Sequence, residues 1–169
     1  VQLVLDADAL NLLAEDRQLE SALCSRPLPA ILTPHPAEAA RLLGCTVGDI
    51  QADRLKAAGE LAGRYRCHVA LKGCGTVIAA VDGKKWLNST GNPGMATAGM
   101  GDVLSGLIVA LLAQNWPPEM ALLAGVHLHG AAADRLVAKG VGPVGLTAGE
   151  VIDAARDLFN DWVASHGSL

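Results

Sequence analysis

Short apolar runs, each bounded by polar or turn-forming residues, recur along this chain. Runs of this length predict strands, and the first three have the character of strands buried in a parallel sheet. The last two flank Asp82-Gly83, a dipeptide that predicts a hairpin turn. The predicted strands are residues 1–5, 30–33, 68–72, 76–81 and 84–87.

Amphipathic or strongly apolar stretches lie between and after these runs and predict helices. Asp8 and Asp49 stand where caps are expected, Pro36 occupies a first helical position, and Gly44 ends the helix that Pro36 begins. This alternation predicts an α/β fold, a three-layer α/β/α sandwich whose mostly parallel central sheet is covered on both faces. The predicted helices cover residues 8–14, 36–43, 49–65, 103–113, 118–139 and 147–164.

The composition fits this architecture and excludes one class of function. The 169 residues are enough for a real core, and we expect residues 1–169 to form one domain. Hydrophobic residues make up 51% of the chain, but few are aromatic, which is typical of helices packed closely on a sheet. The net charge is −4 without a basic run, so the positive surface of a general nucleic-acid binder is missing. An anionic substrate would have to be held by local groups.

The cysteines and the termini give expectations about location and completeness. The four cysteines form no C-x-x-C pair, which predicts reduced thiols in a cytoplasmic protein. The longest uncharged stretch, residues 103–118, is too short and too interrupted to span a bilayer, so no membrane association is expected. Because the chain begins within an apolar run and without Met, we expect an N-terminal part of the fold to be absent.

Residues 88–102 form a glycine-rich segment that leads into an apolar helix. Gly99, Met100 and Gly101 stand at the helix start, where free backbone N–H groups and the helix dipole form an anion hole for a phosphate. Asp102 follows directly and is the candidate catalytic base for a hydroxyl that attacks the phosphate. An isolated G-x-G-D would more often hold a plain helix-capping acid. The segment is neither a Walker A loop nor a Rossmann fingerprint.

A second glycine turn follows the predicted strand at residues 68–72. Ligands bind beyond the carboxyl ends of strands in open α/β sheets, so the backbone amides of this turn are candidates for holding a nucleotide. A plain β-turn is the alternative. The two glycine turns are separated by one hairpin, and their convergence on one site would favour the nucleotide hypothesis. The candidate nucleotide-binding residues are Lys72, Gly73, Cys74, Gly75 and Thr76.

Two further polar residues are candidates for contact with substrate. His35 lies between Pro34 and Pro36 in a rigid turn, which suits either a ligand-orienting donor or a turn histidine without a function. Asn92 precedes Pro93, and its amide either contacts substrate or forms an Asx-turn.

The spacing of His127 and His129 argues against a metal site. Residues two positions apart do not share a helix face, so we interpret both as packing or hydrogen-bonded residues.

These segments together resemble one family, the C-terminal dehydratase domain of NAD(P)HX repair proteins, within the ribokinase-like superfamily. The resemblance covers essentially the whole chain, and its most specific part is the string from Gly91 to Gly106. Within this string, Ala98 stands where family members usually have Gly or a similar small residue. Family domains are also longer at the N-terminal side. The matching segments are residues 6–11, 32–38, 71–76, 91–106, 124–131 and 146–150.

The resemblance implies an enzyme that uses ADP or ATP, with Mg²⁺, to dehydrate (S)-NADHX or (S)-NADPHX to NADH or NADPH. It implies that His35 and Asp102 contact the hydrated cofactor and that Gly101 and residues 72–76 contact the adenine nucleotide. It also implies a homo-oligomer, fused to or partnered with an NAD(P)HX epimerase domain. Two alternatives stay open: a small-molecule kinase of the same superfamily, acting on a hydroxymethylpyrimidine or a sugar, and a non-catalytic nucleotide-binding module.

Overall fold

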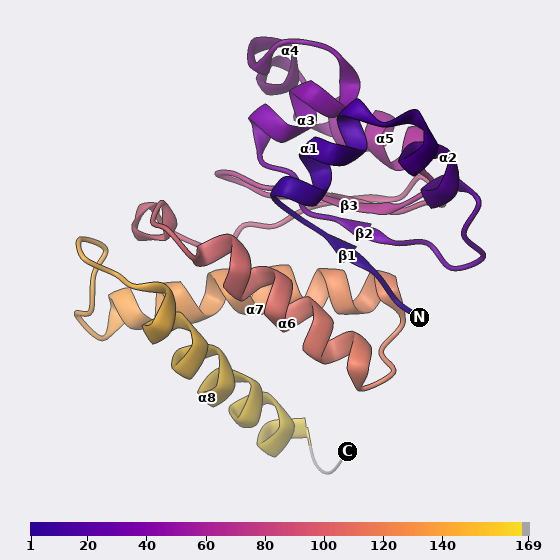
Figure 1. Cartoon of the computed structure of the whole chain (residues 1–169). Coiled ribbons are helices and arrows are strands. Elements are labelled where there is room, and N and C mark those ends of the chain that lie inside the picture. The colour runs from indigo at the N-terminus through magenta and orange to yellow at the C-terminus, as the bar shows by residue number, and fades with distance from the viewer. Residues whose placement is uncertain (167–169) are drawn as a thin grey trace.

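A computed structural model describes residues 1–166 and shows a central sheet between two layers of helices (Figure 1). Its strands lie side by side in chain order. The first three strands run parallel and the hairpin adds two antiparallel strands, so the sheet is mixed. The strands are β1 (Val4–Leu5), β2 (Ile31–Leu32), β3 (His68–Leu71), β4 (Val77–Ala79) and β5 (Lys85–Leu87).

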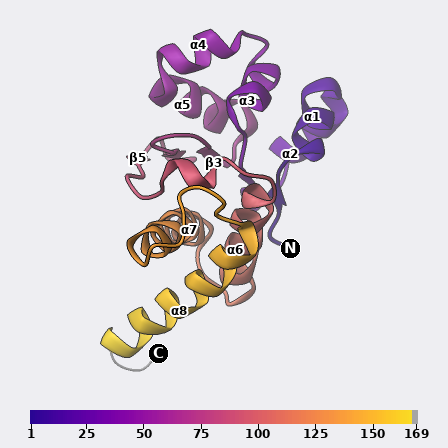
Figure 2. The same ribbon diagram turned by 90° about the vertical axis from the view of Figure 1, so that its left-hand side faces the viewer.

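Helices from the two halves of the chain cover opposite faces of the sheet (Figures 1 and 2). The helices before β3 lie on one face, and the helices after β5 lie on the other, with the last helix on the outside of that layer. The predicted three-layer α/β/α sandwich is confirmed. The first layer consists of α1 (Asp8–Glu15), α2 (Arg17–Cys24), α3 (Pro36–Leu43), α4 (Val47–Ala52) and α5 (Arg54–Tyr65), and the second of α6 (Met100–Ala113), α7 (Pro118–Ala138) and α8 (Ala148–His166).

Side chains of β3 alternate between two apolar clusters. Val69 and Leu71 are fully buried against the layer of α1–α5, in the same cluster as Leu61 and Tyr65 of α5. Ala70 between them faces the other layer, where it packs in a cluster with Ile108 of α6. This alternation is the normal geometry of a strand, and it explains why β3 is apolar along its whole length.

Two predicted helix caps, Asp8 and Asp49, were wrong, although the helix at Asp8 begins where it was predicted. Residues 49–65 form two helices, because Asp53 leaves helical geometry and its side chain caps α5 by accepting from the Lys56 backbone N–H. Asp49 lies inside α4, whose cap is Thr46, as the acidic partner of a capping box. Asp8 is the first residue of α1 rather than its cap, since Ala7 occupies the cap position without a side-chain hydrogen bond.

The start of α6 lies where the glycine-rich segment predicted an anion hole. The helix begins at Met100, and Gly99 before it has a φ of 84°, a left-handed conformation that favours glycine. Asp102 therefore occupies the first turn. None of the helices within residues 1–166 is both long enough and apolar enough to cross a bilayer.

Candidate functional site

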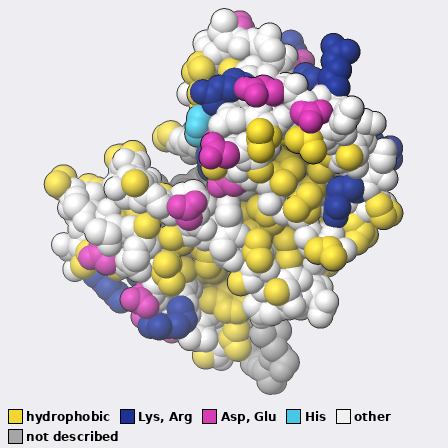
Figure 3. Space-filling view, viewed as in Figure 1, with side chains coloured by type: hydrophobic (Ala, Val, Ile, Leu, Met, Phe, Trp, Pro, Cys, Tyr) yellow, Lys and Arg dark blue, Asp and Glu magenta, His cyan; other side chains and the backbone are white. Residues whose placement is uncertain are grey.

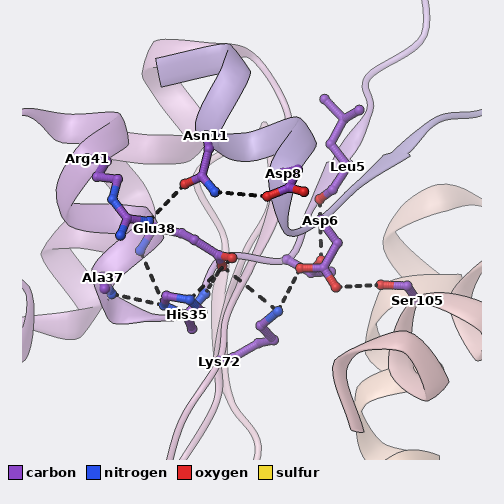
Figure 4. A network of polar contacts seen from close by, with 11 residues as sticks. Leu5, Asp6, Asp8, Asn11, His35, Ala37, Glu38, Arg41, Lys72 and Ser105 are labelled. Atoms are coloured by element: carbon purple, nitrogen blue, oxygen red, sulfur yellow. Dashed lines mark hydrogen bonds and ion pairs between the residues drawn. The ribbon is translucent and has the colours of Figure 1, made fainter. Parts of the chain in front are cut away.

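The carboxyl ends of the three parallel strands meet at one edge of the sheet, and a charged cluster lies there (Figure 4). Asp6 follows β1, Glu38 lies in the first turn of the helix after β2, and Lys72 follows β3. Lys72 Nζ donates to Asp6 Oδ1 at 2.7 Å and lies 4.0 Å from Glu38 Oε2. Each side chain of the cluster is mostly buried. Polar groups from three separate segments are thus brought to the place where open α/β sheets bind ligands.

The start of α6 joins this cluster from the other helix layer. Ser105 Oγ donates to Asp6 Oδ2 at 3.0 Å, so Asp6 bridges Lys72 and α6. A Cβ added at Gly101 would lie 3.4 Å from Asp6 Oδ2 and 3.5 Å from Lys72 Nζ. The two glycine turns identified in the sequence therefore meet at Lys72 and Gly101.

Asp6 is held in its charged form by these neighbours. Burial raises the pKa of Asp6, but the hydrogen bond and the positive charge of Lys72 and the hydrogen bond from Ser105 outweigh it, and the pKa lies below its ordinary value. The free site therefore contains a carboxylate and an ammonium that already neutralise each other.

The carboxylate of Asp102, the candidate base, is unpaired in the described part of the chain. Its side chain is exposed in the first turn of α6, one residue after Gly101. Within residues 1–166 its carboxylate accepts no hydrogen bond and forms no ion pair, and Gly99 leaves α6 without a side-chain cap. Asp102 is therefore not a hydrogen-bonding cap, and its carboxylate is available to a ligand.

His35 acts as the cap of α3. Its Nδ1 accepts from the backbone N–H groups of Ala37 and Glu38, and Glu38 Oε2 accepts from the His35 backbone N–H at 2.7 Å. Because Nδ1 is an acceptor, the neutral ring carries its proton on Nε2, which lies 3.3 Å from Glu38 Oε1. The side chain is 48% exposed, so a contact between His35 and substrate stays a prediction.

Asn92 forms the Asx-turn that the sequence left open as an alternative. Its Oδ1 accepts from the Gly94 backbone N–H, and its Nδ2 donates to Asp134 Oδ1 at 2.9 Å. Asp134, on α7, also accepts from the Gly91 backbone N–H at 2.7 Å. The amide of Asn92 is thus used within the protein, and Asp134, which the sequence did not indicate, fastens the glycine-rich segment to α7.

A pocket of about 480 Å³ borders the glycine-rich segment on the side of the α7–α8 connection. Next to it, a Cβ added at Gly99 would lie 3.1 Å from the Ala148 Cβ, so the pocket adjoins the start of α6. Its lining consists of backbone and uncharged side chains: Pro93, Gly94, Ala96, Thr97, Pro143, Val144, Gly145, Leu146 and Thr147.

In the space-filling view the molecule is hollowed between the two helix layers, and acidic side chains border that hollow (Figure 3).

The two histidines of α7 differ. His127 stacks on Trp162 with ring centroids 5.7 Å apart, so the prediction of a packing residue is confirmed for it. His129 is buried, as expected of a packing residue, and its Nε2 has no hydrogen-bond partner within residues 1–166. Burial and the charge of Lys72 lower the pKa of His129 to about 4. No group of three or more His, Cys, Asp or Glu within residues 1–166 is arranged to hold a metal ion.

Comparison with known proteins identifies relatives over nearly the whole chain. The sequence profile of a family described as NAD(P)H-hydrate dehydratase matches residues 1–155. The ADP-dependent (S)-NAD(P)H-hydrate dehydratase of Neisseria meningitidis is 50% identical over 157 residues, which are 93% of this chain and 53% of that protein. The bifunctional NAD(P)H-hydrate repair enzyme of Moorella thermoacetica is 48% identical over 153 residues, 90% of this chain and 28% of that protein.

A solved structure shows the same fold. The ADP/ATP-dependent NAD(P)H-hydrate dehydratase of Bacillus subtilis, co-crystallised with ATP and Mg²⁺, superposes with a TM-score of 0.81 at 35% identity, over 96% of this chain and 55% of that one. The chain thus spans about half of the Neisseria and Bacillus proteins and less of the Moorella protein.

Proposed function

Since this chain belongs to the NAD(P)H-hydrate dehydratase family, we propose that it carries the catalytic centre for ADP- or ATP-dependent dehydration of (S)-NADHX or (S)-NADPHX. The observation that carries this proposal is the meeting of Lys72 with Gly101, beside the unpaired carboxylate of Asp102. Backbone donors at the start of α6 and the Lys72 ammonium supply positive charge for a migrating phosphoryl group.

In the proposed first step the hydroxyl oxygen of the hydrated ring attacks the terminal phosphorus of the nucleotide. The bond from that phosphorus to the bridging oxygen breaks. The leaving group is AMP when ADP is the donor and ADP when ATP is the donor. Asp102 accepts the hydroxyl proton as the new O–P bond forms. Catalysis of this kind depends on alignment and charge stabilisation more than on covalent help from the protein.

In the second step the phosphorylated ring loses inorganic phosphate. The lone pair of the ring nitrogen drives cleavage of the C–O bond, and a proton leaves the adjacent carbon as the double bond of the dihydronicotinamide forms. The hydroxyl oxygen departs in the phosphate, so each dehydration consumes one phosphoanhydride bond. The uncharged pocket beside Gly99 is suited to a planar ring of one of the two substrates.

Mg²⁺ fits this centre as an ion carried by the nucleotide. The described residues offer no cage of three or more protein ligands, but Asp6 and Asp102 supply carboxylate oxygens near the start of α6, the ligand type that Mg²⁺ takes beside phosphates and water. Bound there, it would neutralise phosphate charge. Lys72 and the α6 amides would then orient the same phosphates.

We also propose that the intact protein is a cytoplasmic homo-oligomer and works with an NAD(P)HX epimerase activity. The bifunctional nature of the Moorella relative, of which this chain spans 28%, supports fusion to a second activity.

A kinase of the same superfamily is the principal alternative, because the same helix start would serve it. The two functions differ in their products. The dehydratase releases one inorganic phosphate for each NADH or NADPH formed, whereas a kinase accumulates a stable phosphorylated product and no reduced cofactor. An assay of the intact protein with (S)-NADHX, Mg²⁺ and either ADP or ATP distinguishes them. If the assay shows no release of phosphate and no rise in NADH absorbance, the proposal is contradicted.

A further inference from the structure

Arg54 reaches from the start of α5 to the turn at residues 72–76. It is the first residue of α5, placed there by the break between α4 and α5. Its Nη2 donates to the Leu71 carbonyl at 2.9 Å and to the Gly75 carbonyl at 3.3 Å. One carbonyl directly precedes the turn and the other lies near its end, so one guanidinium links the two ends of the turn.

The backbone of the turn is shaped around this guanidinium. Gly73 has a φ of 147°, and a methyl group at this position would overlap Nη1 of Arg54 and lie 2.9 Å from Nη2. The absence of a side chain at Gly73 is therefore what lets the guanidinium lie against the turn. On the opposite side, Thr76 Oγ1 closes the turn by donating to the Gly73 carbonyl at 3.2 Å.

The charge of Arg54 is not neutralised by the protein. Within residues 1–166 no carboxylate lies within 4.0 Å of its guanidinium, and its buried Nε has no hydrogen-bond partner. A cation at the first position of a helix is also opposed by the helix dipole. A partly buried cation without an acid is costly unless an anion completes the site.

We propose that Arg54 is a positioning residue for the adenine nucleotide: it fixes the backbone of residues 72–76 so that their amides face the phosphates, and its positive charge draws the nucleotide to that turn. This inference rests on the proposed function. It assigns to Arg54 an effect on the nucleotide and none on the hydrated dinucleotide. Gly73 is required for the same arrangement, since its lack of a side chain provides the space that the guanidinium occupies.

The test compares Arg54→Met, Arg54→Lys and Gly73→Ala in the intact protein, with Lys56→Met as the control. Lys56 lies on the same helix and is 70% exposed, so its replacement removes one positive charge together with an exposed ion pair to Glu60. The Kd for ADP and ATP is measured by calorimetry, and KM is measured separately for the nucleotide and for (S)-NADHX. Hydrogen exchange of the amides of residues 72–76 reports the order of the turn.

We expect Arg54→Met to weaken nucleotide binding about 10- to 100-fold, the range for hydrogen bonds from a charged group, with the KM for (S)-NADHX unchanged. Arg54→Lys keeps the charge and loses the paired hydrogen bonds, so its affinity falls between those of wild type and Arg54→Met. Gly73→Ala also weakens nucleotide binding, because a methyl group displaces the guanidinium and because a φ of 147° strains a residue with a side chain. Exchange of the turn amides is faster in each variant and unchanged in Lys56→Met.

Nucleotide affinity of Arg54→Met equal to that of Lys56→Met overturns the inference and leaves the proposed function intact. An equal rise in both KM values also overturns it, because that result indicates a general structural role. Absence of nucleotide binding by the wild type would overturn the proposed function together with this inference.

Discussion

Lys72 and Asp6 form an ion pair of 2.7 Å between positions 66 residues apart in the chain. The pair joins the ends of β1 and β3 across β2, so it is both a clasp of the sheet and part of the candidate site. The ammonium of Lys72 has three N–H donors, and Asp6 occupies only one of them. Even with Glu38 Oε2 at 4.0 Å, Lys72 keeps donor capacity for a phosphate at Gly101, where an added Cβ would lie 3.5 Å from Nζ.

Replacing Asp6 with Asn removes the negative half of this clasp. We expect Asp6→Asn to lower the free energy of unfolding at pH 7 by about 1.5–3 kcal/mol, because hydrogen bonds to a charged group of low exposure are lost. The folded-state pKa of Asp6 lies below its ordinary value of 3.8, so its contribution is fully present above that pH and is lost as the pH falls through the folded pKa. Urea unfolding at pH 7 and at pH 3 measures both effects.

Asp8→Asn is the control for this comparison, since Asp8 is exposed and, within residues 1–166, its side chain accepts only from Asn11 at 3.5 Å. A loss at pH 7 as small as that of Asp8→Asn would show that the Asp6–Lys72 pair does not stabilise the sheet.

Alanine substitutions at two glycines of α6, Gly101 and Gly106, distinguish an effect on nucleotide binding from an effect on protein stability. A methyl group at Gly101 would lie at ordinary contact distance from Asp6 and Lys72 but would cover the approach to the α6 amides. We expect Gly101→Ala to fold with a Tm close to that of wild type and to lose at least tenfold in nucleotide affinity, about 1.4 kcal/mol. Thermal unfolding and calorimetry with ADP are the measurements.

Gly106 is the matched position, exposed on the same helix with nothing within 4 Å of an added Cβ. Gly106→Ala raises the stability by about 0.5–1 kcal/mol through helix propensity and leaves nucleotide affinity unchanged. Equal nucleotide affinity in the Gly101 and Gly106 variants would remove Gly101 from the proposed phosphate site.

His129 predicts a second pH dependence, in a different window. Its pKa is about 4 in the folded protein against an ordinary value of 6.5, so between these values the unfolded chain binds a proton that the folded protein excludes. The free energy of unfolding therefore has its full value with respect to His129 above pH 6.5. It declines as the pH falls toward 4, by an amount on the order of 3 kcal/mol.

Replacing His129 with Leu removes this decline, because no group then titrates at the buried position. His127→Gln, a change at a histidine that stacks on the surface of α8, keeps it. Unfolding free energies at pH 4.5, 5.5 and 7 test this directly. A pH dependence of His129→Leu parallel to that of wild type would show that another group is responsible.

The sequence predicts elements well where local signals decide them and poorly where a tertiary contact does. Pro36 and Gly44 bound α3 as expected, and Asp82-Gly83 turns the hairpin, because each signal acts through its own backbone. The break at Asp53 was missed because residues 49–65 have continuous helical periodicity, although the Asp53 side chain caps the second helix and the contact of Arg54 with the β3 turn follows directly.

The residues of the candidate site also fall into those that local motifs predict and those that depend on tertiary contacts. The glycines, Lys72 and Asp102 stand out as motifs, and the sequence placed them correctly at a strand end and a helix start. Asp6 and Glu38 were not among the predicted site residues, because their contact with Lys72 depends on strand order, which the pattern of residues leaves open. His35 and Asn92 each had two interpretations, and the hydrogen bonds of the folded chain show a helix cap and an Asx-turn.

The rate of phosphate release by Asp102→Asn in a single turnover, with (S)-NADHX and ADP or ATP, tests the central claim most directly. Asn keeps the shape of the side chain and the α6 amides but accepts no proton, so we predict a nucleotide Kd within about twofold of wild type and a rate of phosphate release lower by about 10²- to 10⁴-fold. Asp157→Asn, at an exposed carboxylate of α8, should leave both quantities unchanged. Phosphate release by Asp102→Asn at the wild-type rate would contradict the role of Asp102 as the base.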